Sequence, residues 1–438
     1  MKKLIILAMI LALSVTAAFA SGSKEADTGS KSDNKIEISF SGYLVNGDGA
    51  EAAAVAFDSV RTQFLKDNPN VVWNEDMLAH DQYSNKVIVD ASGDNLSDIF
   101  MVKAEWINNW VENEYLGSMN DFLDNDEEWV AGFAPNVFSE FTRNNNVYGI
   151  PYRIDTTANL FYNEEILKEC GITEFPKDLE EFREVVRIIR NKGFIPITAG
   201  NLGGWFVDIC IFRAFVDRFC GNEWNASMNM KNGEAAFTDK VFIDALKEFE
   251  GLVKDGAFNS DINSIDFIQG YTNFYQGKAA MLFDGSGGIL PHTMTAPAEI
   301  VEAMKVTKLP DMKGGKGTGI PGTAGWAIAY NKNVAPEKLP IIEKFVKAIG
   351  SSDFANIQAV NSGTHAYKTS EIDTSKISPL MNEYNKMMET VPMNLAVTFS
   401  PAVLDVMYSG LQEIIIRTTT PEALAEKLQK AYASDLVK

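Results

Sequence analysis

The residues of this chain whose types could do chemistry are its three histidines, a serine in a glycine-rich turn and its many carboxylates. His80, His292 and His365 are far apart and lack metal-ligand spacing. Ser286 lacks the glycine two positions earlier that a nucleophile elbow requires. The 59 acidic residues leave a pair of glycosidase carboxylates open, because only separation in space would identify such a pair. We therefore expect no metal site and no catalytic motif.

A glycine pattern at Gly317, Gly319 and Gly322 has the spacing of a dinucleotide-binding fingerprint. That fingerprint has to open a helix, whereas this segment precedes an expected strand. We interpret it as a flexible loop and expect no cofactor.

A second group of residues combines aromatic rings with planar polar side chains near the ends of expected strands. Rings stack on apolar faces, and carboxylate, guanidinium and amide groups accept or donate several hydrogen bonds at once. Ligands of doubly wound sheets gather at the carboxyl ends of the strands. The candidate ligand-binding residues are Ser41, Gly42, Tyr43, Asp81, Gln82, Glu105, Trp106, Arg153, Asp155, Trp205, Asp208, Asp284, Trp326 and His365.

Structural roles are alternatives for several of these candidates. Trp205 opens an apolar helix and is as well suited to core packing as to stacking on a ligand. Trp106 and Trp110 are four residues apart, which places both on one helix face. Arg153 and Asp155 have the spacing to pair with each other. Asp284 also suits a turn, and His365 a solvated loop.

The elements that must position these side chains alternate between strands and helices. Strands are expected at 36–40, 71–73 and 97–102, with helices at 48–64 and 83–91 between them. The pair Asp48 and Glu51 predicts the start of the first helix. This β-α-β-α-β order predicts a doubly wound α/β fold.

The alternation continues along the chain. Lys177, Asp178 and Glu181 predict a helix start, with Gly193 as its stop. Further strands are expected at 194–198, 279–283, 303–308 and 325–331, and further helices at 205–219, 240–254, 267–276, 340–349 and through the C-terminus to 433.

The first 35 residues have the pattern of a leader and a tether. Lys2 and Lys3 precede an apolar run at 4–15, and small residues at 18 and 20 form a signal peptidase site. We assign residues 1–20 to a signal peptide and the polar segment 21–35 to a flexible tether. The mature protein is expected to be soluble and outside the cytoplasm, with no cysteine near the cleavage point for a lipid anchor.

Length, charge and cysteines narrow the class further. About 418 residues after cleavage exceed the roughly 250–300 at which one core stops growing, so two domains are expected. A formal charge of −20 opposes nucleic-acid binding. The odd set Cys170, Cys210 and Cys220 excludes complete intramolecular pairing, and we expect three buried or unreactive thiols.

Several motifs resemble those of family-1 extracellular solute-binding proteins, the group that includes maltose-binding protein. The similarity covers nearly the whole mature chain in order. Its motifs are Ser92-Gly93-Asp94, Asp98-Ile99-Phe100, Tyr148-Gly149-Ile150-Pro151-Tyr152, Tyr162-Asn163, Gly171-Ile172, the strand from Gly277 to Met281, Gly285 and Gly325-Trp326. The chain departs from the pattern at Ser97, at Lys177-Asp178 and at Ser286-Gly287-Gly288, where relatives carry an aromatic residue.

The resemblance implies a two-lobe, periplasmic-binding-protein-like fold (type II) with a ligand cleft between two doubly wound lobes. Residues 36–150 plus 306–351 would form lobe 1, and 151–305 plus 352–438 lobe 2, with crossings near Ile150, Val306 and Ser351. It implies a monomeric receptor, not an enzyme, that captures a carbohydrate by lobe closure and passes it to the permease of an ATP-driven importer. A sugar suits the candidate residues, because it offers apolar ring faces and an edge of hydroxyls.

Two alternatives remain. A glycerol phosphate or phosphodiester ligand would need Arg153 and a second cation to hold the phosphate. A secreted glycan-active enzyme would change an oligosaccharide, whereas a receptor returns it unchanged.

Overall fold

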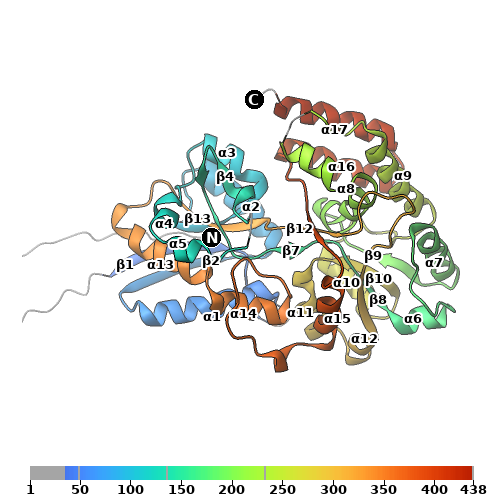
Figure 1. The fold of residues 1–438 in the computed structure, drawn as a ribbon, viewed down its shortest axis with the longest axis horizontal. Helices are drawn as coiled ribbons and strands as arrows, with labels where there is room; N and C mark the ends of the chain where they lie inside the picture. The colour runs from blue at the N-terminus through green and yellow to red at the C-terminus, as the bar shows by residue number, and fades with distance from the viewer. Residues whose placement is uncertain (1–34, 48–49, 135–136, 231–232, 437–438) are drawn as a thin grey trace, which may run out of the picture. The chain divides into compact units, whose positions relative to one another are not determined.

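A computed structural model describes residues 35–47, 50–134, 137–230 and 233–436. The predicted signal peptide, nearly all of the predicted tether and Asp48 lie outside the described residues. Within the described chain the buried apolar side chains form two separate clusters. The first core takes its members from 38–152 and 324–366. The second takes them from 158–309 and 380–432. In Figure 1 the first core is accordingly blue, cyan and orange, and the second is green, yellow and red.

The first core is built on a five-stranded sheet. Its order is β2 (Val71–Met77), β1 (Ile36–Gly42), β3 (Ile99–Lys103), β13 (Trp326–Tyr330) and β6 (Ile150–Pro151). β1 is parallel to β2 and β3, whereas β13 is antiparallel to β3 and β6. Ile99, Phe100, Met101 and Val102 are all buried, as expected of a strand covered on both faces.

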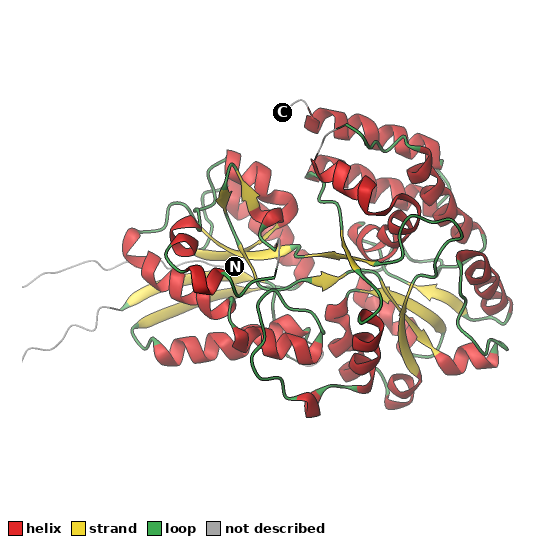
Figure 2. Cartoon of the chain, in the orientation of Figure 1, coloured by secondary structure: helices red, strands yellow, loops and turns green. Residues whose placement is uncertain are grey.

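Helices lie on both sides of this sheet, as Figure 2 shows. They are α1 (Ala52–Asp67), α2 (His80–Ser92), α3 (Ile107–Glu112), α4 (Asn120–Asp124), α5 (Glu127–Val130), α13 (Leu339–Ile349) and α14 (Ser352–Asn361). A short hairpin of β4 (Thr142–Arg143) and β5 (Asn146–Val147) lies beside them. The stripe Ala53, Phe57, Val60 and Phe64 of α1 is buried, as its spacing predicts.

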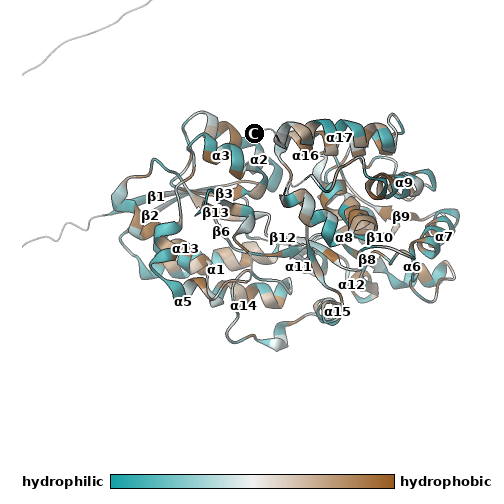
Figure 3. Ribbon diagram, turned by 45° about the horizontal axis from the view of Figure 1, so that its top comes forward, coloured by the Kyte–Doolittle hydropathy of each residue, from teal (hydrophilic) through white to brown (hydrophobic). Residues whose placement is uncertain are grey.

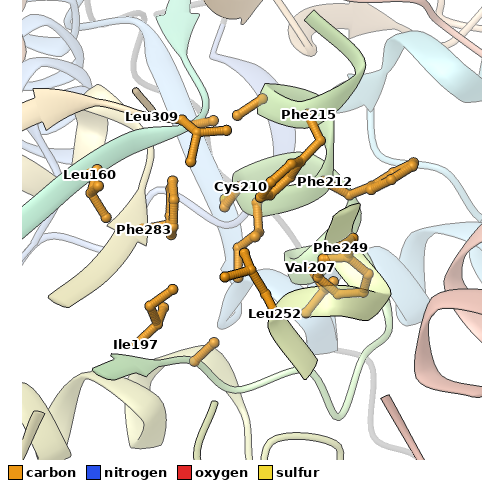
Figure 4. Close-up of a cluster of buried hydrophobic side chains, with 14 of the residues drawn as sticks. Leu160, Ile197, Val207, Cys210, Phe212, Phe215, Phe249, Leu252, Phe283 and Leu309 are labelled. Atoms are coloured by element: carbon orange, nitrogen blue, oxygen red, sulfur yellow. The ribbon is translucent and has the colours of Figure 1, made fainter. Parts of the chain in front are cut away.

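The second core is built on a four-stranded sheet. Its order is β11 (Met304–Lys308), β8 (Asn159–Asn163), β10 (Ala279–Asp284) and β9 (Ile195–Thr198). β10 is parallel to β9, and β8 is antiparallel to β10 and β11. Figure 4 shows part of the packed interior, with Leu160 and Phe283 from the sheet on the side of Cys210.

The helices of the second core are amphipathic, with brown and teal faces in Figure 3. They are α6 (Glu164–Glu169), α7 (Leu179–Asn191), α8 (Arg213–Met230), α9 (Lys240–Lys254), α10 (Phe267–Tyr275), α11 (Ile289–Thr295), α12 (Ala298–Ala303), α15 (Pro379–Met388), α16 (Pro401–Ile415) and α17 (Pro421–Leu436). The predicted start of α7 is confirmed, because the Asp178 carboxylate accepts a hydrogen bond from the Glu181 amide at 2.9 Å. Gly193 closes it with a φ of 96°.

Two crossover segments and a later strand form a small sheet of their own. β12 (Ile320–Thr323) pairs with β7 (Asp155–Thr156) and with β14 (Met393–Leu395). In Figure 1, β7 and β12 lie between the two larger sheets. Core membership changes between Tyr152 and Ala158 and between Leu309 and Ala324.

The last change of core membership lies between Ala366 and Leu380, later than the crossing expected near Ser351. The reason is that α14 packs against α1 and buries Phe354 in the first core. The segment 352–366 therefore packs in the first core. Strand β11 is part of the second sheet. The chain therefore leaves the second core after Leu309, later than the crossing expected near Val306.

One local prediction was wrong. α1 begins at Ala52, after Glu51, whose side chain makes no cap hydrogen bond because its carboxylate binds Arg153. The helix expected at 205–219 is present, and it contains the π-helical stretch η3 (Val207–Phe212) before α8. Within α8, Gly221 has a φ of 73°, and a Cβ there would lie 2.8 Å from the Lys316 Cβ.

The three cysteines are unpaired and buried, as the sequence predicts.

Candidate functional site

Aromatic side chains from both cores meet in one cluster, which we call the aromatic cluster. Its members are Tyr43, His80, Trp106 and Trp326 from the first core and Trp205 and Phe267 from the second. Tyr43 follows β1, His80 follows β2, Trp106 follows β3 and Trp326 begins the antiparallel β13. All four elements therefore bring their rings to the same edge of the first sheet, the edge at which ligands of such sheets bind.

Within the first core the rings are in close contact. The Tyr43 and Trp326 ring centroids are 4.6 Å apart, those of Tyr43 and His80 5.0 Å, and those of Trp106 and Trp326 5.6 Å. Trp106 also stacks on Trp110 at 5.2 Å. Trp106 therefore packs in the first core and also borders the aromatic cluster.

His80 joins the two halves of the cluster. Its ring centroid lies 5.5 Å from that of Trp326 in the first core and 5.3 Å from that of Trp205, which packs on the second. Trp205 in turn lies 5.3 Å from Phe267. The sequence analysis did not include His80 among the ligand-binding candidates, although it directly precedes Asp81.

Asp81 forms a hydrogen bond with His80, the ring that contacts both cores. His80 Nδ1 lies 2.7 Å from the Asp81 carboxylate. The hydrogen bond with His80 holds the pKa of Asp81 below its usual value, with a smaller contribution from a hydrogen bond with Trp205. Burial lowers the pKa of His80, so its neutral form is favoured. The neighbouring candidate Gln82 is exposed on α2.

A lysine that the sequence analysis missed lies beside the indole rings. Lys103 Nζ is 5.2 Å from the Trp326 ring centroid and 5.3 Å from that of Trp106. The Glu105 carboxylate lies 3.9 Å from the same ammonium. Lys103 is the last residue of β3, so the strand end predicted to carry Glu105 and Trp106 also carries a cation.

Arg153 and Asp155 form an ion-paired group beside the cluster. Arg153 Nη1 lies 2.6 Å from the Glu51 carboxylate, and its Nε lies 2.7 Å from that of Asp155. The Arg153 guanidinium carbon lies 5.9 Å from the Tyr43 ring centroid. Burial acts to lower the pKa of Arg153, but the charges of Asp155 and Glu51 outweigh it and raise the pKa above its usual value. Its positive charge is therefore matched by two carboxylates.

Asp155 also links residues from both cores. Its Oδ1 accepts hydrogen bonds from Ser286 Oγ at 3.3 Å and from Thr364 Oγ1 at 3.4 Å. Ser286 lies between β10 and α11 of the second core, and Thr364 follows α14. A Cβ on Gly287 would lie 3.4 Å from Glu51 Oε2. The glycine turn that departs from the family pattern thus faces the ion-paired group.

Five candidates make contacts that serve the fold. Asp208 is buried and pairs with Arg213 at 3.0 Å. Asp284 accepts a hydrogen bond from Tyr271 at 2.6 Å and lies 3.1 Å from His292 Nε2. The remaining three are buried or have backbone partners: Ser41 is buried, Gly42 accepts a hydrogen bond from the Leu78 amide, and His365 Nδ1 lies 2.7 Å from the Tyr367 carbonyl.

The site residues missed by sequence reasoning are His80, Lys103, Glu51, Tyr152, Ser286 and Thr364. Tyr152, for example, has its hydroxyl 2.8 Å from that of Tyr43. Polarity next to a strand end could have indicated His80 and Lys103. No local signal brings Glu51 to Arg153, because the two are 102 positions apart.

Across the described residues, histidine, cysteine and carboxylate side chains form no group of three or more that could hold a metal ion. In the same part of the chain, no helix has the length and apolar character needed to cross a membrane.

Comparisons with known proteins identify the family and the fold. The model of the family described as bacterial extracellular solute-binding protein matches residues 46–355. A chitin oligosaccharide binding protein superposes with a TM-score of 0.79 at 19% identity, over 92% of this chain and 100% of that one. A maltose-bound MalE3 of T. maritima gives a TM-score of 0.73 at 18% identity, over 91% and 99%.

A third structure comes from work on xylan utilization by Caldanaerobius polysaccharolyticus, with a TM-score of 0.78 at 21% identity, over 90% of this chain and 99% of that one. At these identities the structures establish the two-lobe fold alone. The family match covers more than half of the chain. The protein therefore belongs to the bacterial extracellular solute-binding proteins, a family of binding receptors and not of enzymes.

Proposed function

We propose that this protein captures a neutral carbohydrate between its two lobes and delivers it to the permease of an ATP-driven importer. The observation that carries the proposal is the aromatic cluster, which takes rings from both cores and is bordered by Asp81, Glu105 and Lys103. A sugar presents apolar C–H faces to rings and hydroxyls to charged side chains, so this combination suits it. The maltose-bound and chitin oligosaccharide binding proteins share the fold.

The charges near the cluster argue against a phosphate ligand. Arg153 is held between Glu51 and Asp155, and Lys103 lies near Glu105. Burial favours neutral His80. A phosphate would have to displace carboxylates from these cations and would meet their repulsion, whereas a hydroxyl accepts and donates hydrogen bonds without displacing them. We therefore prefer a sugar to a glycerol phosphate or phosphodiester.

We further propose that the lobes follow the two cores. Lobe 1 comprises 36–152 plus 324–366, lobe 2 comprises 158–309 plus 380–438, and the crossover strands β7 and β12 act as the hinge. Closure about such a hinge changes the surface that a permease senses. The protein acts as a monomer outside the cytoplasm, after removal of the leader 1–20, with 21–35 as a tether.

A thermal-shift panel tests the ligand class. Mono-, di- and oligosaccharides are compared with glycerol phosphates at matched concentrations. A ligand at a hundred times its Kd adds about 2.7 kcal/mol of stability. We expect at least one neutral sugar to raise the unfolding temperature. A shift with phosphorylated compounds and none with neutral sugars would show that the carbohydrate assignment is wrong.

A further inference from the structure

Glu140 makes an unusual set of hydrogen bonds for a carboxylate outside the ligand site. It belongs to the short helix Ser139–Phe141, which the buried Phe141 anchors in the first core. Its Oε2 accepts hydrogen bonds from the backbone amides of Ala324 at 2.8 Å and Gly325 at 3.3 Å. Both residues lie between the crossover strand β12 and β13.

Glu140 Oε1 accepts a hydrogen bond from Thr323 Oγ1 at 2.9 Å and from Thr398 Oγ1 at 2.7 Å. Thr323 ends β12, so it belongs to the same crossover. Thr398 is fixed to the second core, because its amide donates to Asn229 at 3.1 Å and its neighbours Val397 and Phe399 are buried there. One carboxylate thus joins the first core, the crossover and the second core.

The position of this carboxylate bears directly on the aromatic cluster. Trp326 follows Gly325 and begins β13. The backbone turn that Glu140 holds is therefore the turn from which the Trp326 ring enters the cluster. The Thr398 bond, in contrast, reaches across to the second core and has no part in holding that turn.

We propose that Glu140 is a positioning residue that couples the hinge to closure. Its bonds to Thr323, Ala324 and Gly325 fix the crossover at Trp326, and its bond to Thr398 holds the two lobes together before ligand arrives. Opening requires the Thr398 bond to break. The inference rests on the proposed closure of the lobes and does not depend on the ligand being a sugar.

The test measures the distance between the lobes in the ligand-free protein. Spin labels are placed at Val89→Cys on α2 and Ile268→Cys on α10, both of which are exposed. The three native cysteines are buried, so labelling is confined to the introduced ones. Thr398→Val removes the hydroxyl at nearly constant volume. A hydrogen bond to a charged group is strong enough that its loss should raise the ratio of open to closed protein roughly tenfold or more.

Two matched variants separate this role from a structural one. Thr398→Ser keeps the hydroxyl and is expected to restore the wild-type distance distribution. Thr323→Val removes a bond to the same carboxylate that stays within the crossover and does not reach the second core, so it should change the ratio of open to closed protein less than Thr398→Val does. Glu140→Gln should open the lobes and also alter the Trp fluorescence, because its amide has a single acceptor oxygen and cannot accept from the two backbone amides and the two threonine hydroxyls together.

A wild-type distance distribution in Thr398→Val would overturn the proposal, as would an equal shift in Thr323→Val. Because these distances are measured without ligand, failure of the sugar panel together with an opened Thr398→Val variant would reject only the ligand assignment.

Discussion

At the residue scale, the rings of the aromatic cluster differ in how deeply they are buried and in what they contact. Trp326 is 6% exposed and touches Tyr43, His80 and Trp106, so it is part of the first core as well as of the cluster. Trp205 is only partly buried and lies at the edge facing His80. The two tryptophans are therefore expected to respond differently to truncation.

Trp205→Ala should weaken sugar binding by about tenfold or more, because truncating a large aromatic anchor costs about 2 kcal/mol or more and about 1.4 kcal/mol is tenfold. Trp326→Ala should lower the free energy of unfolding by about 3–5 kcal/mol as well, since it leaves a cavity in the first core. Calorimetric titration and urea unfolding measure the two effects. A wild-type unfolding free energy for Trp326→Ala would show that Trp326 does not support the core.

His80 makes stability depend on pH. Because burial lowers its folded pKa below the ordinary 6.5, the unfolded state binds the proton more readily. The contribution of His80 to the free energy of unfolding is therefore fully present above pH 6.5. It is lost as the pH falls from 6.5 through the lowered folded pKa. The charged groups acting on the ring are Asp81, Lys103 and Glu51.

Urea unfolding at pH 7.5 and 5.5 tests this linkage. The wild type should lose more stability on acidification than His80→Gln, whose side chain does not titrate. Gln82→Ala, which changes an exposed neighbour on α2, serves as the control. It should lose as much unfolding free energy on acidification as the wild type does. If His80→Gln loses as much unfolding free energy between pH 7.5 and 5.5 as the wild type does, another group titrates in this range.

Sequence reasoning predicted the single residues unevenly. Six candidates lie in or beside the aromatic cluster, and each stands beside an expected strand end or crossover turn: Tyr43, Asp81, Trp106, Arg153, Trp205 and Trp326. Asp208 has the same kind of position, but the π-helical stretch around it turns its carboxylate to Arg213. Only a three-dimensional contact separates the two cases.

At the element scale, local signals predicted most helices and strands. The start and stop of α7 follow from Asp178 and Gly193, and α9 has the bounds expected from the sequence. The start of α1 was placed too early, because Glu51 pairs with Arg153 from a distant part of the chain. Capping rules describe a helix end by itself and do not include such long-range competition.

The turn between β10 and α11 illustrates how an element sets the site. A Cβ on Gly288 would overlap the Asp284 carboxylate and lie 3.0 Å from His292 Nε2. A Cβ on Gly287 would make only ordinary contact with Glu51. The turn can therefore tolerate a side chain at one of its two adjacent glycines.

Gly288→Ala should lower the free energy of unfolding by about 1–3 kcal/mol, because the added methyl group overpacks the turn. Gly287→Ala is the matched control and should stay within about 0.5 kcal/mol of the wild type. Thermal and urea unfolding compare the two. A neutral Gly288→Ala would mean that Asp284 is free to move away, and that it does not fix this turn.

At the scale of the whole molecule, the sequence predicted two α/β units and the family, while the small sheet that joins the two cores was found only in the structure. Length and the strand-helix alternation indicate two cores. The sheet that joins them pairs 155–156, 320–323 and 393–395, segments of two to four residues without a periodic pattern. The packing of Phe354 in the first core likewise depends on α1, which is nearly 300 positions away.

The central claim is that a neutral carbohydrate is held between the two lobes by their closure. The most direct test is the distance between spin labels at Val89→Cys and Ile268→Cys during titration with neutral oligosaccharides and with glycerol phosphates. We predict that a neutral sugar narrows the distribution to one short distance and that glycerol phosphates leave it unchanged. A distribution that no neutral sugar alters, or that only the phosphorylated compounds alter, would contradict the account.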